Sequence, residues 1–204
     1  MKWLVIACLL AATPAHAEPD YYPRLSGGAG IGWFLGDVGV LHPSGATFEL
    51  AGEASLTSSI SLRATYEHAR LFARDDILTS HLRASLDGVA ALVRHPIFGF
   101  GDKTIPFGGD MFVLAGVEYE RFAFEGGGLL ARYEAVVGMG GTVVISDANR
   151  RPYQMIEYGL RMMFSRAPDP GKLPFGCDGP CDKPTKTAPY DHTIDMDLAW
   201  LFGR

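Results

Sequence analysis

Apolar and polar side chains alternate with a period of two along most of this sequence. In residues 48–56, for example, Phe48, Leu50 and Leu56 share one face of an extended chain, whereas Glu49 and Glu53 share the other. Successive side chains of a β-strand point to opposite faces, so this alternation predicts a strand with one apolar face. Eight segments show the pattern, some more cleanly than others: residues 25–35, 48–56, 60–68, 82–92, 111–119, 129–139, 154–164 and 192–202.

Charge separates the two faces of these segments. The apolar faces, to which we assign residues such as Leu62, Leu86 and Leu92, contain no Asp, Glu, Lys or Arg. The opposite faces carry Glu49, Glu53, Arg63, Glu67, Arg83, Asp87, Glu118, Arg132, Glu134, Glu157, Arg161, Asp195 and Asp197. The strands therefore lie between one environment that accepts charge and one that excludes it.

Periodicity alone does not tell which face is inside. A soluble lipocalin-like barrel surrounds an apolar ligand with its apolar face, whereas a membrane barrel turns that face toward lipid. Segments of about nine to eleven residues match a tilted strand that crosses a bilayer. Aromatic residues such as Trp33, Tyr66 and Trp200 lie near segment ends, as in interfacial girdles. The charged faces contain Arg but no Lys, which suits a confined interior because a guanidinium group binds several carboxylates. These features favour the membrane.

The strand pattern resembles that of the small eight-stranded outer-membrane β-barrels, of the OmpA transmembrane-domain or OmpX kind. The resemblance covers residues 23–204, and its best local element is the final strand, residues 194–202. That strand, with Trp200 and Phe202, is similar to the C-terminal signal by which the barrel-assembly machinery recognises its clients. The resemblance implies an all-β, eight-stranded antiparallel up-and-down transmembrane β-barrel in the outer-membrane lipid of a Gram-negative cell envelope.

The interior of such a barrel is just wide enough for side chains to fill it. Arg63, Arg83, Arg132 and Arg161 are expected to pair with the surrounding carboxylates, because unpaired buried charge is costly. We therefore expect a filled, charged lumen rather than a large pore, and a structural or surface-interaction role. The alternatives are a barrel-type lipid-modifying enzyme and a soluble lipocalin-like binder of an apolar ligand.

Composition and charge agree with an exported β protein. The 25 glycines and 13 prolines among 204 residues are typical of strands joined by turns. The net charge of −5 lacks the basic excess that nucleic-acid binding requires, so we expect no nucleic-acid partner. Lys2, an apolar stretch over residues 3–12 and the small residues Ala15 and Ala17 predict a signal peptide at residues 1–17. Residues 18–204 then form the barrel domain.

The links between strands divide into turns on the periplasmic side and loops on the outer side. We expect turns at residues 57–59, 94–109 and 146–151, and outer loops at residues 36–46, 71–80, 121–128 and 165–191. The last loop contains six of the 13 prolines and two cysteines. Because functional contacts concentrate on loops, we expect an extracellular partner to bind there.

Cys177 and Cys181 remain as a pair once the signal peptide, with Cys8, is removed. In an exported chain, a local disulfide is the leading interpretation of such a pair. A metal site completed by Asp178, Asp182 or His192 is the alternative, but no second cysteine pair or histidine cluster supports it. We expect neither a metal nor a cofactor.

Two serine and histidine combinations stand out as candidates for nucleophilic catalysis. They are His42 with Ser44, and Ser80 with His81. A barrel deacylase is expected to present a His-x-Ser pair on a strand near the outer rim, with a carboxylate that orients the histidine. His42 and Ser44 instead fall in a loop with Pro43 between them, so we assign no catalytic residue.

Overall fold

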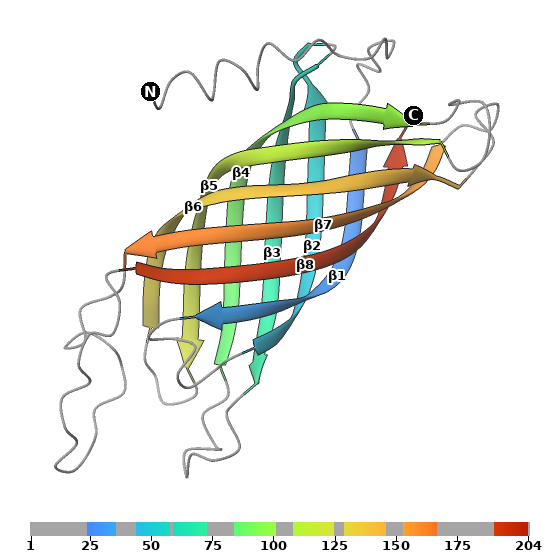
Figure 1. The fold of residues 1–204 in the computed structure, drawn as a ribbon. Coiled ribbons are helices and arrows are strands. Elements are labelled where there is room, and N and C mark those ends of the chain that lie inside the picture. The colour runs from blue at the N-terminus through green and yellow to red at the C-terminus, as the bar shows by residue number, and fades with distance from the viewer. Residues whose placement is uncertain are drawn as a thin grey trace, which may run out of the picture.

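The computed structural model describes residues 24–35, 44–57, 59–72, 84–100, 108–124, 129–145, 153–166 and 190–203. These residues form β1 (Arg24–Leu35), β2 (Ser44–Ser55), β3 (Ser61–Phe72), β4 (Ala84–Phe100), β5 (Gly109–Phe124), β6 (Leu129–Val144), β7 (Tyr153–Arg166) and β8 (Tyr190–Gly203). Each strand pairs with the next in antiparallel fashion, and β8 pairs with β1, so the sheet closes into a barrel (Figure 1). The predicted all-β, eight-stranded up-and-down barrel is confirmed. The described residues contain no helix that is long and apolar enough to cross a membrane.

The register tilts the strands around the barrel. Starting from Arg24, the directly paired residues are, in order, Glu53, Arg63, Leu92, Gly116, Val136, Met163, Thr193 and, again on β1, Phe34. One circuit therefore ends ten residues farther along β1, the difference between 34 and 24. For eight strands, this offset corresponds to a tilt of about 40° from the barrel axis.

The two ends of the barrel are distinguished by the strand ends that lie at each. β1 begins and β8 ends at one of them, which we call the terminal end and which is uppermost in Figure 1. At the opposite end, which we call the distal end, β1 stops at Leu35 and β2 starts at Ser44. The residues described between β2 and β3 are at the terminal end, where the backbone amides of Leu56 and Thr57 donate hydrogen bonds to the carbonyl of Ile60.

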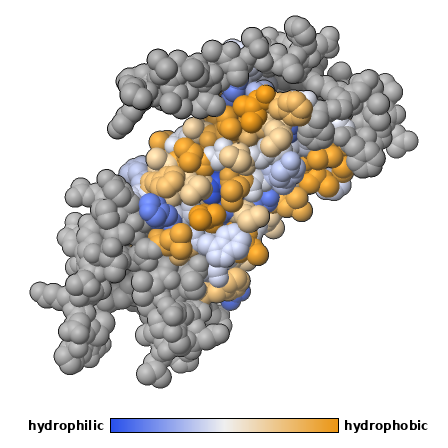
Figure 2. Space-filling view, viewed as in Figure 1, coloured by the Kyte–Doolittle hydropathy of each residue, from blue (hydrophilic) through white to orange (hydrophobic). Residues whose placement is uncertain are grey.

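The barrel turns its apolar face outward and its charged face inward. On β2, Phe48 and Leu50 are 48% and 50% exposed, whereas Glu49 between them is 3% exposed. The predicted faces hold in the same way on β1, β3, β5, β6, β7 and β8. In Figure 2, apolar side chains accordingly cover much of the outer wall along the strands. The structure thereby answers the question that periodicity left open.

The prediction was wrong for β4, whose two faces are reversed. Leu86 and Leu92 are each 1% exposed and point into the barrel, whereas the side chain of Asp87 is 46% exposed on the outside. Both faces of this strand are largely apolar, so its own alternation does not distinguish them. Pairing with β3 determines which face points inward, because directly opposite residues share a face. Buried Ala69 lies opposite Leu86, and His68 lies opposite Asp87.

The expected turn at residues 94–109 was also wrong, because nearly all of its described residues belong to strands. β4 continues to Phe100, and β5 begins at Gly109. The register of this pair shifts between Pro96 and Phe98, as in a β-bulge. Proline has no N–H to donate to the ladder, and a bulge is a place where strands accept it. The neighbouring His95 donates from Nδ1 to the carbonyl oxygen of Ser59 at 2.6 Å, which ties β4 to the β2–β3 connection.

Apolar side chains fill the distal end of the interior. One buried cluster includes Phe34, Leu71, Leu86, Phe122, Phe124 and Leu130, all from the distal halves of their strands. The rings of Phe34 and Phe122 meet edge to face, with their centroids 6.1 Å apart. A second cluster, which includes Leu92, Phe112, Leu114, Val136 and Met163, lines the wall formed by β4 to β7. The remaining interior is polar and charged.

Candidate functional site in the barrel interior

The structure places most of the residues predicted for the lumen inside the barrel. These are Glu49, Glu53, Arg63, Glu67, Glu118, Arg132, Glu134, Glu157, Arg161, Asp195 and Asp197. Asp87 is the exception, since it lies on the outer face of the reversed strand β4. Arg83 lies outside the described residues.

Arg63 connects opposite walls of the barrel. From β3, its Nη2 atom donates to Glu49 Oε1 on β2 at 2.6 Å, and its Nη1 atom donates to Glu157 on β7. All three side chains are no more than 4% exposed. β3 and β7 are four strands apart, so this guanidinium group crosses the lumen.

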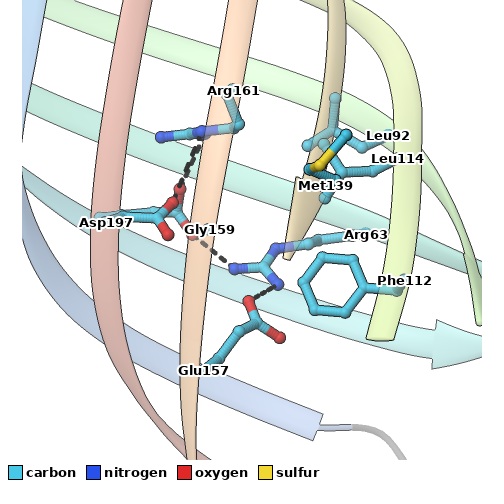
Figure 3. A pocket seen from close by; sticks show the side chains of 10 residues that line it. Arg63, Leu92, Phe112, Leu114, Met139, Glu157, Gly159, Arg161 and Asp197 are labelled. Carbon is cyan, nitrogen blue, oxygen red and sulfur yellow. Dashed lines mark hydrogen bonds and ion pairs between the residues drawn. The ribbon is translucent and has the colours of Figure 1, made fainter. Parts of the chain in front are cut away.

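Arg161 makes the reverse crossing, from β7 to β2 and β3. Its Nη atoms lie 2.8 Å from Glu49 Oε2 and 2.7 Å from Glu67 Oε2. It also donates to Asp195 and has Asp197 Oδ2 at 3.6 Å from Nε, both on the neighbouring strand β8. Arg63 and Arg161 share Glu49 and flank one cavity, with Glu157 and Asp197 beside them (Figure 3).

Sequence reasoning missed three charged members of this network, Arg94, Asp110 and Glu120. Arg94 lies 3.1 Å from Glu53 Oε1 and 3.2 Å from Asp110 Oδ1, with its guanidinium carbon 3.9 Å from the centre of the Phe112 ring. Extending the period of two beyond the expected strand ends reaches Arg94 and Glu120. It places Glu120 on the inner face after Glu118, but it places Arg94 with Leu92 on the face that the sequence assigned to lipid, so finding Arg94 also required the observed orientation of β4.

The wall formed by β5 and β6 carries a second group of charges. Arg132 Nε donates to Glu120 Oε2 at 2.8 Å, and Arg132 Nη2 lies 2.8 Å from Glu134 Oε1. Glu118 lies directly opposite Glu134 and is 1% exposed. Within the described part of the chain, neither oxygen of Glu118 has a hydrogen-bond partner.

Carboxylates outnumber arginines in this interior. Among the described residues, the buried charged side chains comprise seven glutamates and Asp195 against Arg63, Arg94, Arg132 and Arg161. Since a buried charge without compensation is costly, the excess negative charge has to be balanced by protons, cations or solvent. Among the described residues, no group of three or more His, Cys, Asp or Glu side chains is arranged to hold a metal ion.

Several predicted features fall on residues that the structure does not describe. They are the signal peptide at residues 1–17, His42, the combination of Ser80 with His81, and the pair Cys177 and Cys181, whereas Ser44, the candidate partner of His42, is the first residue of β2. The loop at residues 165–191 is described only at its edges. On β8, Trp200 is 40% exposed on the outer face, and the backbone of Phe202 pairs with Leu25 and Gln154.

Comparison with known proteins identifies the fold. The crystal structure of Neisserial surface protein A, NspA, matches with a TM-score of 0.52 at 11% sequence identity, over 90% of this chain and 97% of that one. The attachment invasion locus protein Ail of Yersinia pestis matches with a TM-score of 0.49 at 10% identity, over 91% of this chain and 100% of that one. No protein-family model and no curated protein sequence matches the chain. The fold is that of the small eight-stranded outer-membrane β-barrels, which confirms the resemblance at the level of architecture.

Proposed function

We propose that this protein is an integral outer-membrane barrel whose charged interior is filled, and that it acts as a structural or surface-interaction protein rather than as a large pore. The observation that carries the proposal is the reversal of polarity across the barrel wall. Exposed Leu50 and Leu198 belong to a largely apolar exterior, while Arg63 and Arg161 are buried inside.

The apolar exterior supports the membrane location. Leu25, Leu50, Val117, Met139 and Leu198 are each at least 50% exposed and lie on strands distributed around the barrel. Water-soluble proteins rarely expose so much contiguous apolar surface, whereas membrane barrels carry an apolar band of this kind. The lipocalin-like alternative requires an apolar interior around a ligand, and the polarity observed is the opposite.

The interior supports a closed barrel. Arg63 and Arg161 join β3 and β7 across the lumen, and the apolar cluster around Phe34 and Phe122 occupies the distal end. Side chains that fill an eight-stranded barrel leave no wide channel. Export by residues 1–17, assembly through the strand that carries Trp200 and Phe202, and a partner outside the cell at residues 165–191 belong to the same proposal.

Insertion into lipid is tested by an arginine scan at two depths. Leu198→Arg places a charge in the middle of the apolar exterior and is expected to lower the free energy of unfolding in lipid vesicles by about 2–4 kcal/mol. Leu35→Arg, on the same face but at the distal end of β1, is the matched control and is expected to cost about 0–1 kcal/mol. Equal costs, or a protein that remains monodisperse in buffer without detergent, would contradict the membrane location.

Closure of the lumen is tested by electrical recording. The full chain, refolded and inserted into planar bilayers, is expected to show no large, persistent conductance. Stable steps of the size seen for porins would contradict the filled interior while leaving the membrane location intact.

A further inference from the structure

Three charged side chains on the described exterior lie on neighbouring strands. Among the exterior side chains that the structure describes, the charged ones are Arg70 on β3, Asp87 on β4 and Arg121 on β5. These three strands are consecutive neighbours. On the opposite wall, the described exterior side chains near the distal end include Trp33, Phe164 and His192, with the His192 ring 5.2 Å from that of Phe164.

Asp87 lies on the strand between the two arginines and already has two hydrogen-bond donors. Asp87 lies directly opposite both His68 and Arg121. Its Oδ1 atom accepts hydrogen bonds from the Tyr66 hydroxyl at 2.8 Å and from His68 Nδ1 at 2.9 Å. No ion pair of Arg70 or Arg121 occurs within the part of the chain that the structure describes. Among the described residues, both guanidinium groups therefore keep hydrogen-bonding capacity for another anion.

Arg70 and Arg121 flank the same spot. Arg70 lies opposite Ser85, which precedes Asp87 by two residues on the outer face of β4. With usual strand spacings, the Cα atoms of Arg70 and Arg121 are about 12 Å apart, on either side of β4. The tilt of the strands brings them to nearly the same height along the barrel axis. Two long side chains at this separation can converge over Ser85 on one group.

Exposed tyrosines near Arg70 and Arg121 indicate where these arginines lie relative to the membrane surface. Tyr66, Tyr119 and Tyr133 are exposed on β3, β5 and β6, and the last two rings lie 5.1 Å apart. Tyrosines of membrane proteins favour the headgroup level, where one end of the ring is apolar and the other is wet. Arg121 follows Tyr119 by two residues on β5, and Arg70 follows Tyr66 by four residues on β3, so both arginines lie beyond these tyrosines toward the distal end.

We propose that Arg70 and Arg121 bind the phosphomonoester of a lipid headgroup in the leaflet at the distal end of the barrel. The planar guanidinium fork matches phosphate oxygens, and a phosphomonoester carries enough charge for two such groups. Both cations stand on the described exterior, on the two strands that flank β4. Their position among lipid-facing side chains selects a lipid over a soluble anion. The inference rests on the proposed membrane location.

The test measures lipid binding to the refolded full chain in detergent by native mass spectrometry. The probes are phosphatidic acid, which carries a phosphomonoester, phosphatidylcholine, and inorganic phosphate. The wild type is expected to retain phosphatidic acid in preference to phosphatidylcholine, and Arg70→Gln with Arg121→Gln to weaken that binding about tenfold. His192→Gln, at the distal end of the opposite wall, is the matched control and is expected to leave it unchanged.

The outcomes separate this inference from the one on which it rests. Unchanged binding in a double variant that folds and inserts like the wild type overturns the site and leaves the membrane location standing. Displacement of phosphatidic acid by inorganic phosphate at similar concentration assigns the arginines to a soluble anion and also overturns it. A wild-type chain that does not insert into vesicles overturns both.

Discussion

Two pairs of glutamates in the barrel interior begin from the same local arrangement and end in different environments. Glu49 on β2 lies directly opposite Glu67 on β3, and Glu118 on β5 lies directly opposite Glu134 on β6. Like charges in such positions destabilise a sheet. Arg161 reaches across from β7 and contacts both members of the first pair, at 2.8 and 2.7 Å.

The second pair has no arginine between its members. Arg132, on the same strand as Glu134, contacts Glu134 and Glu120, whereas both oxygens of Glu118 lack a hydrogen-bond partner in the described structure. The comparison shows that the local arrangement of two facing acids does not determine how much their burial costs the folded barrel. The deciding factor is whether an arginine from the opposite wall of the barrel contacts both acids, as Arg161 does for Glu49 and Glu67.

Removal of Arg161 is expected to have the largest effect. Arg161→Met leaves Glu49, Glu67 and Asp195 buried with less compensation, and breaking a buried ion pair from one side costs about 3–5 kcal/mol. The free energy of unfolding of the protein refolded into vesicles, measured by denaturant titration, reports this loss. A change as small as that of an exposed ion pair would mean that these carboxylates are compensated by something other than Arg161.

Neutralising one member of each glutamate pair gives the most direct comparison. Glu49→Gln removes the charge that Arg63 and Arg161 share and is expected to destabilise by about 1–3 kcal/mol. Glu118→Gln removes an unpartnered charge and relieves repulsion, so it is expected to stabilise by up to about 1 kcal/mol. The same unfolding titration measures both variants. If Glu118→Gln destabilised as much as Glu49→Gln, Glu118 would have to hold a cation or another partner.

The smallest expected effect concerns the space beneath Glu118. A Cβ atom added at Gly88 would lie 2.3 Å from Glu118 Oε1, so the side chain would have to move. We expect Gly88→Ala to cost about 1 kcal/mol, as overpacking typically does. Gly99→Ala, on the same strand, is the control, because its Cβ would meet only the Gly109 carbonyl oxygen at 3.8 Å.

A double-mutant cycle checks the cause of that cost. In a Glu118→Ala background the clash is gone, so Gly88→Ala should lose most of its effect and give a coupling energy of about 1 kcal/mol. Additive effects would show that the Glu118 side chain is not packed against Gly88.

The sequence alone determined the architecture and most of the wall. A period of two is a local property of a strand, and it correctly sorted the faces of seven strands, including the exterior position of Leu198 and the interior position of Arg161. Its weakness lay at the strand ends. Arg94 and Glu120 continue the inner faces of β4 and β5 but fell outside the predicted segments.

Only the tertiary structure decided the orientation of β4 and the partners of each charge. The alternation within β4 suggested the wrong orientation, because charged Asp87 lies on its outer face and apolar Leu86 on its inner face. Which face points inward follows from hydrogen-bonded pairing with β3, which no pattern within β4 encodes. In the same way, Glu49 and Glu118 look alike in sequence, each charged within an alternating strand. Closure and tilt of the barrel bring Arg161 into contact with Glu49. Among the described residues, no arginine contacts Glu118. Contacts across the lumen depend on the register of all eight strands together, and therefore on the closed sheet rather than on any one segment.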